Sequence, residues 1–408
     1  MIYQSQMKIL FLIDSLSGGG AERACLNIAS LLCDFHDVWV ASLFSVKKDP
    51  GYLYDDRINI VRLEIRNSKH LKDKPRLYEQ EYHRVKALKK QICPDLCISF
   101  LETSGFLNVI TGGSEKKIVS VRNYYSVSLR QERYFFRRIK AAVTLKLADK
   151  IVAVSKDCKK DLVDNFGVSP DKIVSIYNFY DPNRSAPAPR SNAVRLFMKD
   201  GMTHRIISIG RFHMQKAQQH LIRAFKAVSE KYPGAVLFLF GKGETEAYLQ
   251  KVIAANGLEN QIVLMPFDPN TTWYLERADL YVSTSLNEGF SNSMLEALAS
   301  GTPVISSDCH SGPRELLAPD TDFSLKTVSA EYAEYGVLIP EFTGHVLTDE
   351  PLERSEELLA EAMIRLLEHP QIRAGYSAKE KKRVQDFSSE KIIAQWRTVI
   401  DDVCSGNS

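Results

Sequence analysis

The sequence Ala278–Asp308, ADLYVSTSLNEGFSNSMLEALASGTPVISSD, is organised as a strand, a loop, a helix, a loop and a second strand. Leu280–Thr284 is a short β-branched and aromatic run, which is typical of a buried parallel strand. Ser291 and Asn292 are good N-cap residues for a helix that Gly301 ends. We therefore expect a βαβ unit whose loop and helix start lie at the carboxyl edge of a parallel sheet, where ligands bind.

Two glutamates frame this loop. Glu288 precedes Gly289 and Phe290, so we expect it outside the helix at the crevice, whereas Glu296 lies within the helix. The unpaired amides of a helix start attract a phosphate, and a carboxylate can accept hydrogen bonds from both hydroxyls of a ribose. The unit therefore suits a sugar nucleotide, with phosphate at the amides of Ser291–Ser293, ribose at Glu296 and the sugar near Glu288.

The same residues carry a family resemblance. Glu288 and Glu296, with seven residues between them, resemble the glutamate pair of family 4 retaining glycosyltransferases, and so do the flanking runs EGF, LEALASGTPVI and SDCHSGPREL. The resemblance extends over nearly the whole chain. It implies a GT-B fold, which is an α/β architecture of two Rossmann-like doubly wound domains facing a central cleft. It also implies that Glu288 contacts the donor sugar and Glu296 the ribose. The alternative is an ordinary βαβ helix with two surface glutamates.

Length and composition fit an ordinary globular protein. The 408 residues suffice for two domains or more, with 44% apolar and 25% charged residues, and a net charge of +3 does not indicate nucleic acid. The seven cysteines are scattered, and Cys93 and Cys97 are spaced wrongly for a zinc knuckle. We expect a reduced cytoplasmic setting. The apolar run near the amino terminus spans about six residues, against roughly 20 for a transmembrane helix.

Strands and helices alternate in two halves, which favours doubly wound parallel sheets. The strands expected in the first half are Lys8–Ile13, Asp37–Leu43, Ile58–Leu63, Leu96–Phe100, Lys117–Val121, Lys150–Val154 and Lys172–Tyr177. Those of the second half are Arg205–Ile209, Ala235–Phe240, Gln261–Met265, Leu280–Thr284, Val304–Ser307 and Gly336–Ile339. We expect an acceptor domain at 1–185, a linker at 186–203, a donor domain at 204–384 and a helix at 385–408. By the resemblance, that helix crosses back onto the first domain.

Two cations follow a strand in the second half. Gly210 and Arg211 follow the strand, and Lys216 lies five residues after Arg211. Arg can bind a diphosphate bidentately, and Lys adds a mobile positive charge. The resemblance implies that both residues neutralise the departing diphosphate. Ala217 stands where the family commonly has glycine. The alternative is a solvated surface pair.

Further donor contacts are expected at other strand ends. Gly241 fits a turn beneath the nucleotide, although an ordinary loop explains it equally well. By resemblance, Pro266 and Phe267 stand where the base is read through backbone groups, but Phe267 also suits a core position. Gly19 and Gly20 belong to GGGAER, which resembles the family's glycine loop facing donor and acceptor; a tight turn is the alternative.

The first half offers acceptor contacts. Glu102, Arg122 and Asn123 follow expected strands, and Arg122 suits either an acceptor phosphate or a salt bridge between domains. The family's histidine in this region is missing from SVRNYYS. Asp320–Asp322, an Asp-x-Asp in a polar loop, does not fit a metal-dependent transferase, so we expect neither a metal nor a cofactor.

Arg130–Lys140 (RQERYFFRRIK) carries five basic residues against one acid, interleaved with aromatics. Such a segment suits peripheral contact with an anionic membrane, here the inner face of the cytoplasmic membrane. A solvated helix face is the alternative, and nothing else in the sequence supports nucleic acid.

The residues and the family resemblance together imply a metal-independent retaining glycosyltransferase. We expect it to move a hexose or N-acetylhexosamine from a nucleotide donor, expected to be UDP-linked, to a glycan or polyprenyl-diphosphate-linked acceptor in cell-surface polysaccharide biosynthesis. The alternatives are a sugar-nucleotide epimerase of the same fold and a non-catalytic partner subunit.

Overall fold

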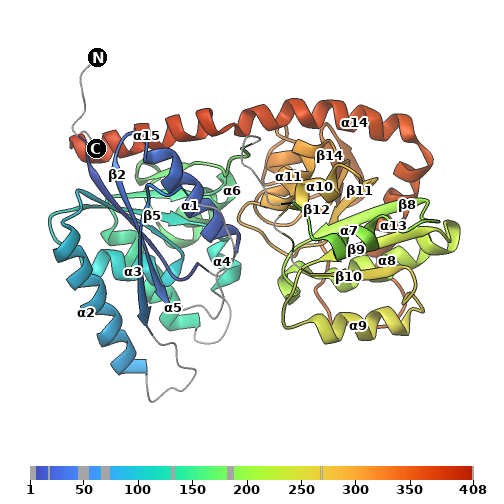
Figure 1. Ribbon diagram of the computed structural model, residues 1–408, viewed down its shortest axis with the longest axis horizontal. Helices are drawn as coiled ribbons and strands as arrows, with labels where there is room; N and C mark the ends of the chain where they lie inside the picture. Colours follow the sequence, from blue (N-terminus) through green and yellow to red (C-terminus); the bar gives the residue numbers. More distant parts are fainter. Residues whose placement is uncertain are drawn as a thin grey trace. The chain divides into compact units, whose positions relative to one another are not determined.

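The computed structural model describes residues 6–16, 19–44, 55–65, 74–129, 134–181, 188–266, 268 and 270–406. They form two compact units. Unit 1 comprises Met1–Asn178 with Ser389–Ser408, and unit 2 comprises Phe179–Ser388 (Figure 1). Each is a sheet covered by helices on both faces, so the expected α/β class is confirmed.

Unit 1 is built on a seven-stranded sheet in the order β3-β2-β1-β4-β5-β6-β7. Every pairing is parallel, and the strand order reverses between β1 and β4, as in a doubly wound sheet. Its strands are β1 Lys8–Ile13, β2 Asp37–Phe44, β3 Asn59–Ile65, β4 Leu96–Phe100, β5 Lys116–Val121, β6 Lys150–Ala153 and β7 Ile173–Ser175. Its helices are α1 Gly20–Leu32, α2 Lys74–Ile92, α3 Glu102–Ile110, α4 Tyr125–Ser128, α5 Tyr134–Leu147, α6 Lys156–Phe166, the 3₁₀ turn η2 Pro170–Lys172 and α15 Ser389–Ser405.

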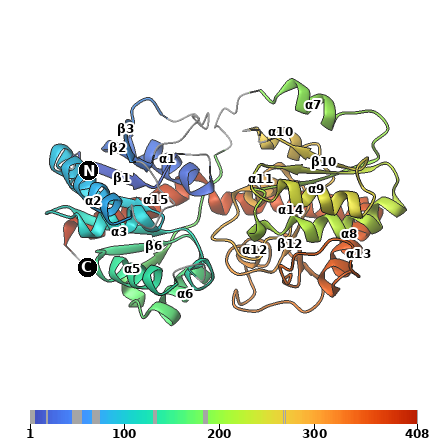
Figure 2. The ribbon, with the colours of Figure 1, turned by 90° about the horizontal axis from the view of Figure 1, so that it is seen from below.

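The core of unit 1 lies on both faces of this sheet. Helices α2, α3 and α5 cover one face, and α1 and α15 lie on the other (Figures 1 and 2). β4 is buried along its whole length because both faces are covered. Trp396 of α15 is fully buried and stacks on Phe100 of β4, with ring centroids 6.3 Å apart. The last helix therefore belongs to the core of unit 1.

Unit 2 repeats this plan in the order β10-β9-β8-β11-β12-β14-β13, with the reversal between β8 and β11. All pairings are parallel except β13 with β14. Its strands are β8 His204–Ile209, β9 Ala235–Phe240, β10 Ile262–Met265, β11 Leu280–Ser283, β12 Val304–Ser307, β13 Glu331–Ala333 and β14 Gly336–Ile339. Its helices are α7 Ser191–Phe197, η3 Met214–Lys216, α8 Gln218–Lys231, α9 Glu246–Ala255, α10 Thr271–Leu275, α11 Asn292–Ser300, α12 Pro313–Leu317, α13 Arg354–Glu368, α14 Pro370–Arg383 and η4 Val384–Phe387.

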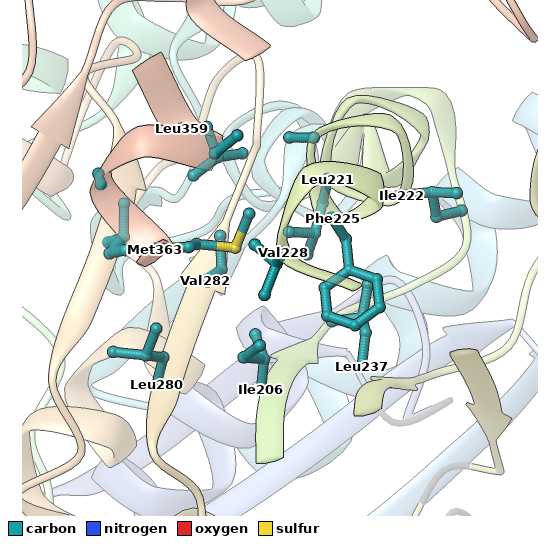
Figure 3. Packing of buried hydrophobic residues seen from close by; sticks show 14 of the residues in the cluster. Ile206, Leu221, Ile222, Phe225, Val228, Leu237, Leu280, Val282, Leu359 and Met363 are labelled. Carbon is teal, nitrogen blue, oxygen red and sulfur yellow. The ribbon is translucent and has the colours of Figure 1, made fainter. Parts of the chain in front are cut away.

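The main core of unit 2 lies between the sheet and helices α8 and α13. Figure 3 shows Leu221 and Phe225 of α8 and Met363 of α13 among side chains from β8, β9 and β11. Helices α10, α11 and α14 pack on one another and cover the other face. The packing fixes the carboxyl ends of β8 and β11 side by side, which is where a doubly wound sheet binds its ligand.

The segment 186–203, expected as a linker, contains helix α7. Phe197 at its end is fully buried and packs on Phe238 of β9, with ring centroids 4.6 Å apart. Burial of this ring explains why the segment folds with unit 2 although its composition suggests a linker. The short antiparallel strand β13 was also not expected from the sequence.

Candidate active site

The loop after β8 and the loop after β11 are joined at the point where the strand order of unit 2 reverses. Leu286 donates its backbone N–H to the carbonyl of Gln215 at 2.8 Å, and Gln215 Nε2 donates to the carbonyl of Asn287 at 2.8 Å. Thr284 Oγ1 donates to the carbonyl of Lys216 at 3.1 Å. These bonds hold the two loops as one rigid surface.

An ion pair lies at the centre of this surface. Lys216 Nζ is 2.5 Å from Glu288 Oε1, and Ser285 Oγ donates to the same oxygen at 2.6 Å. The side chain of Glu288 is 8% exposed, and its backbone N–H donates to the carbonyl of His310 at 3.0 Å. A Cβ on Gly210 would lie 3.2 Å from Lys216 Cε, so glycine leaves room for the lysine stem. The structure thus brings three predicted residues together.

The turn that carries Lys216 has a strained end. His213 Nδ1 accepts a hydrogen bond from the N–H of Gln215 at 3.1 Å and caps the turn η3. Ala217 follows with a φ of 46°, in the left-handed region that glycine adopts without strain. This φ is a physical reason for the glycine that the family commonly has here.

Arg211 is held through its backbone alone. Gln218 Nε2 donates to its carbonyl at 3.0 Å, and the residue is exposed. Within the described part of the chain, its guanidinium has no hydrogen-bond or ion-pair partner. An exposed guanidinium beside the Lys216 loop is suited to bind an anion bidentately.

The start of helix α11 follows this ion pair. Ser291 is its N-cap, and its Oγ accepts from the N–H of Met294 at 3.4 Å. Gly289 and Phe290 are buried, and Asn292 is half-buried at the first helical position. A helix of this length presents unpaired amides and a partial positive charge at this end.

Glu296 lies within α11, as expected, and is 4% exposed. Thr271 Oγ1, at the start of α10, donates to its Oε2 at 2.7 Å. This hydroxyl orients the carboxylate, and sequence reasoning did not find it because Thr271 is 25 residues away in the chain.

The ends of β9 and β10 complete the edge. A Cβ on Gly241 would lie 2.0 Å from the carbonyl oxygen of Gly210, so these two strand ends require glycine there. Pro266 is exposed directly after β10, whereas Phe267 lies outside the described residues. Buried Asp268, which was not predicted, accepts from the hydroxyl of Tyr274 at 2.9 Å and anchors this loop.

The glycine loop of unit 1 lies at the carboxyl end of β1. Gly19 precedes α1 as its N-cap, and Gly20 is its first residue. A Cβ on Gly19 would lie 2.3 Å from Oε2 of Glu22, which is 7% exposed. Ser15 Oγ donates to Glu22 Oε1 at 3.3 Å. Glu22 is therefore a buried carboxylate at this loop, and sequence reasoning did not find it.

Arg122 is buried within unit 1. Its guanidinium donates to Asn178 Oδ1 and lies over the ring of Phe100, 5.4 Å from the centroid. Burial lowers the pKa of Arg122 to about 10. Arg122 thus supports this edge of the sheet from within.

Glu102 and Asn123 are less buried. Glu102 forms a bidentate ion pair with Arg137 of α5, with an Nη2–Oε1 distance of 2.8 Å. Asn123 is half-buried after β5. Leu101, just before Glu102, has a φ of 75°, so the chain turns sharply from β4 into α3.

Part of the basic segment on α5 is engaged by neighbouring residues. Arg130 and Arg133 lie outside the described residues. Arg138 donates to the carbonyl of Asn165 at 2.8 Å, and burial lowers the pKa of Lys140. Among the helices that the structure describes, none is both long and apolar enough to cross a membrane.

One group of metal-ligating side chains occurs in the described residues, namely His220, Glu353 and Glu356. Arg223 donates to both carboxylate oxygens of Glu356, at 2.8 and 3.1 Å. His220 Nδ1 is 2.7 Å from Glu356 Oε1, which is a hydrogen-bond distance. The group is therefore a buried hydrogen-bonded network between α8 and α13 that an arginine already neutralises.

Comparisons with known proteins identify a family for this chain. A family model described as Glycosyltransferase Family 4 matches residues 18–184, and one described as Glycosyl transferases group 1 matches residues 197–335. An uncharacterized glycosyltransferase of Methanocaldococcus jannaschii is 34% identical over 285 residues, which cover 68% of this chain and 67% of that protein. A Campylobacter jejuni enzyme is 29% identical over 245 residues, covering 60% and 58% respectively. Its name is N-acetylgalactosamine-N,N'-diacetylbacillosaminyl-diphospho-undecaprenol 4-alpha-N-acetylgalactosaminyltransferase.

Solved structures show the same fold. HepE of Anabaena in complex with UDP gives a TM-score of 0.74 at 20% identity, over 97% of this chain and 100% of that one. Sucrose-phosphate synthase of Thermosynechococcus elongatus gives 0.78 at 17% identity, over 98% and 100%. The expected GT-B fold is thus confirmed. Because family models match both halves and the archaeal relative is aligned over two thirds of its length, the chain belongs to glycosyltransferase family 4.

Proposed function

We propose that this glycosyltransferase moves a hexose or N-acetylhexosamine from a UDP-linked donor, with retention of configuration, onto a glycan or polyprenyl-diphosphate-linked acceptor. The product would serve cell-surface polysaccharide biosynthesis. The observation that carries the proposal is the meeting of Arg211, Lys216, Glu288 and the start of α11 at the point where the strand order of unit 2 reverses. This edge offers two cations and helix amides to a diphosphate, beside a carboxylate for a sugar.

In this proposal each group has one task. Arg211 and Lys216 bind the diphosphate and stabilise the charge that grows on it as the glycosidic bond breaks. The amides near Ser291 add a fixed partial positive charge. Glu288 accepts hydrogen bonds from the sugar, and Glu296 from the ribose. The departing phosphate, on the face of the sugar that the acceptor attacks, helps to deprotonate the acceptor hydroxyl.

The comparisons support the choice of donor and acceptor class. HepE has been solved with UDP and with UDP-glucose. The name of the C. jejuni relative specifies transfer of N-acetylgalactosamine to a diphospho-undecaprenol-linked saccharide. We propose the corresponding classes for this protein, a UDP-sugar and a lipid-linked glycan.

The acceptor is proposed to contact unit 1 at the carboxyl edge of its sheet. Gly19 and Gly20 allow close approach to the backbone after β1, and Glu102 and Asn123 follow β4 and β5. Buried Arg122 lies behind them and supports this edge.

We also propose peripheral contact with an anionic membrane through α5. Phe135 and Phe136 are 69% and 67% exposed, and Ile139 is 46% exposed. Exposed aromatic side chains beside the cation of Arg138 suit the interface of an anionic bilayer. This contact would bring the enzyme to the level at which a lipid-linked sugar lies.

The test is a release assay. The purified protein is incubated with UDP-glucose, UDP-galactose, UDP-GlcNAc and UDP-GalNAc, with and without polyprenyl-diphosphate-linked saccharides, and UDP is measured. A transferase releases UDP in an acceptor-dependent manner, and EDTA leaves the rate unchanged because two cations and a helix start carry the diphosphate. Interconversion of donors without acceptor would indicate the epimerase. No turnover with any donor, together with no nucleotide binding, would indicate the partner subunit.

A further inference from the structure

We infer that Glu288 discriminates between sugar-linked and sugar-free nucleotide by competing with the diphosphate for Lys216. This inference rests on the proposed donor site and adds selectivity to it. Either kind of nucleotide has to draw Lys216 away from Glu288, but only a sugar nucleotide brings hydroxyls that replace the lysine on the carboxylate.

The contact between the two residues is short and largely dehydrated. Lys216 Nζ lies 2.5 Å from Glu288 Oε1, with side-chain exposures of 21% and 8%. In the described part of the chain, no other cation pairs with Glu288. The titratable neighbours Cys309 and Tyr281 are a thiol and a phenol whose pKa values are raised, first by burial and then by the charge of Glu288. A buried carboxylate that loses its single cation is strongly destabilised unless donors replace it.

The two partners differ in freedom to move. Glu288 is fixed by its backbone bond to His310, by Ser285 on its carboxylate and by the bonds that join its loop to Gln215. Lys216 reaches it through a flexible four-carbon stem that lies along Gly210. The lysine can therefore turn toward a diphosphate while the glutamate stays in place.

The exchange has opposite outcomes for donor and product. When a sugar nucleotide binds, the sugar hydroxyls donate to Glu288 and Ser285 keeps its bond, so the carboxylate remains satisfied. When UDP binds alone, no donor replaces Lys216, so the carboxylate loses its cation without compensation. Glu288 thus opposes retention of the leaving UDP and favours the next donor.

The test is a double-mutant cycle on UDP binding, measured by calorimetry with the full-length protein. Glu288→Gln keeps the shape of the side chain and removes its charge, so it frees Lys216. It is expected to tighten UDP binding roughly tenfold, an effect between the free energies typical of exposed and of buried ion pairs. In a Lys216→Met background the same change is expected to have no effect on UDP affinity. Glu244→Gln is the matched control. The side chain of Glu244 is 71% exposed, and its Oε1 lies 3.4 Å from Nε2 of His213, which is on the same loop as Lys216. It should leave UDP affinity within about twofold of wild type.

Unchanged or weaker UDP binding by Glu288→Gln overturns the inference, as does tightening that persists in the Lys216→Met background. If Glu288→Gln does not fold, Glu288→Ala carries the same expectation. Loss of UDP binding on Lys216→Met together with no effect of Glu288→Gln would overturn the inference alone and leave the donor site standing. Failure of UDP to bind to any form of the protein would reject the donor site and the inference together.

Discussion

At the scale of single residues, the two cations of the candidate site are presented differently. Lys216 is held by Glu288, whereas only the backbone of Arg211 is fixed. Arg211→Ala and Lys216→Ala are each expected to lower kcat by about 10²–10³-fold, because each removes a cation that stabilises developing charge on the diphosphate. Steady-state UDP release measures this effect.

These two variants should differ in stability. Lys216→Ala leaves the carboxylate of Glu288 without its cation and should lower Tm, whereas Arg211→Ala removes no pair and should not. Lys251→Ala, an exposed lysine on α9, controls for loss of surface charge. Near wild-type kcat in both site variants would refute their assignment to the diphosphate.

A second prediction at this scale concerns Glu380 on α14, which is fully buried. Its Oε1 accepts from the N–H of Val304 at 3.2 Å, and its Oε2 has no partner among the described residues. Burial raises the pKa of Glu380 well above its ordinary value of 4.5. The folded state therefore holds the proton more tightly than the unfolded state. This contribution to stability is fully present below the unfolded pKa and is lost as pH rises toward the folded pKa.

Glu380→Gln keeps the group neutral at every pH. Its free energy of unfolding should match that of wild type near about pH 4.5 and exceed it increasingly at higher pH, by up to about 1.4 kcal/mol for each unit of pKa shift. Urea unfolding between about pH 5 and 8 measures the difference. Glu361→Gln, at an exposed position on α13, is the control and should follow wild type. Parallel curves for Glu380→Gln and wild type would show that Glu380 is ionised in the folded protein.

At the scale of elements, the sequence predicts those helices and strands whose signals lie within the element itself. β11 and α11 were found because an apolar run, an N-cap and a terminal glycine are all local signals, and α11 does begin after Ser291 and end at Gly301. Helix α7 was not found, since Phe197 is buried by contacts with Phe238 and Tyr274, which are distant in sequence. Gln215 and Asp268 were missed for the same reason. Gln215 donates to the carbonyl of Asn287, and Asp268 accepts from the backbone N–H of Arg190, and only the fold brings these partners near.

Helix α5 gives a prediction at the same scale. Phe135→Ser with Phe136→Ser should reduce sedimentation with anionic vesicles at low salt at least about tenfold, because each exposed ring contributes about 1.5–3 kcal/mol when it enters the bilayer. Charge reversal of Arg138 should weaken vesicle binding less than the double phenylalanine change, because the Arg138 guanidinium already donates to the carbonyl of Asn165. Reversal of Arg137 is a poor test because it also breaks the pair with Glu102.

Val328→Ser, which alters a residue of unit 2 that is 89% exposed, is the control for loss of any exposed apolar side chain. Equal sedimentation of wild type with neutral and anionic vesicles, or none with either, would reject the membrane proposal. The family assignment would stand, because it does not depend on α5.

At the scale of the whole molecule, unit 1 is discontinuous in sequence and unit 2 is continuous. The chain leaves unit 1 after Asn178 and returns at Ser389. Within unit 2 the two ends meet, because Tyr180 pairs with Ser388 and donates its N–H to the carbonyl of Phe387 at 3.0 Å. A unit whose ends are bonded to each other and whose sheet is complete has the features of a domain that folds on its own.

The fragment 179–388 is therefore expected to unfold cooperatively and to bind UDP. It should not transfer sugar, because it lacks the sheet of unit 1 whose carboxyl edge is proposed to contact the acceptor. A fragment cut at the boundaries expected from sequence, 204–384, lacks Phe197 and Phe387, which are buried against Phe238 and Phe290. Its free energy of unfolding should be lower by several kcal/mol, since loss of a buried phenylalanine typically costs about 3–5 kcal/mol. Urea unfolding and UDP calorimetry on both fragments, with 179–388 carrying Lys216→Met as the binding control, decide between the two boundaries. If 204–384 were as stable as 179–388, the ring contacts of Phe197 and Phe387 would not contribute to the fold of unit 2.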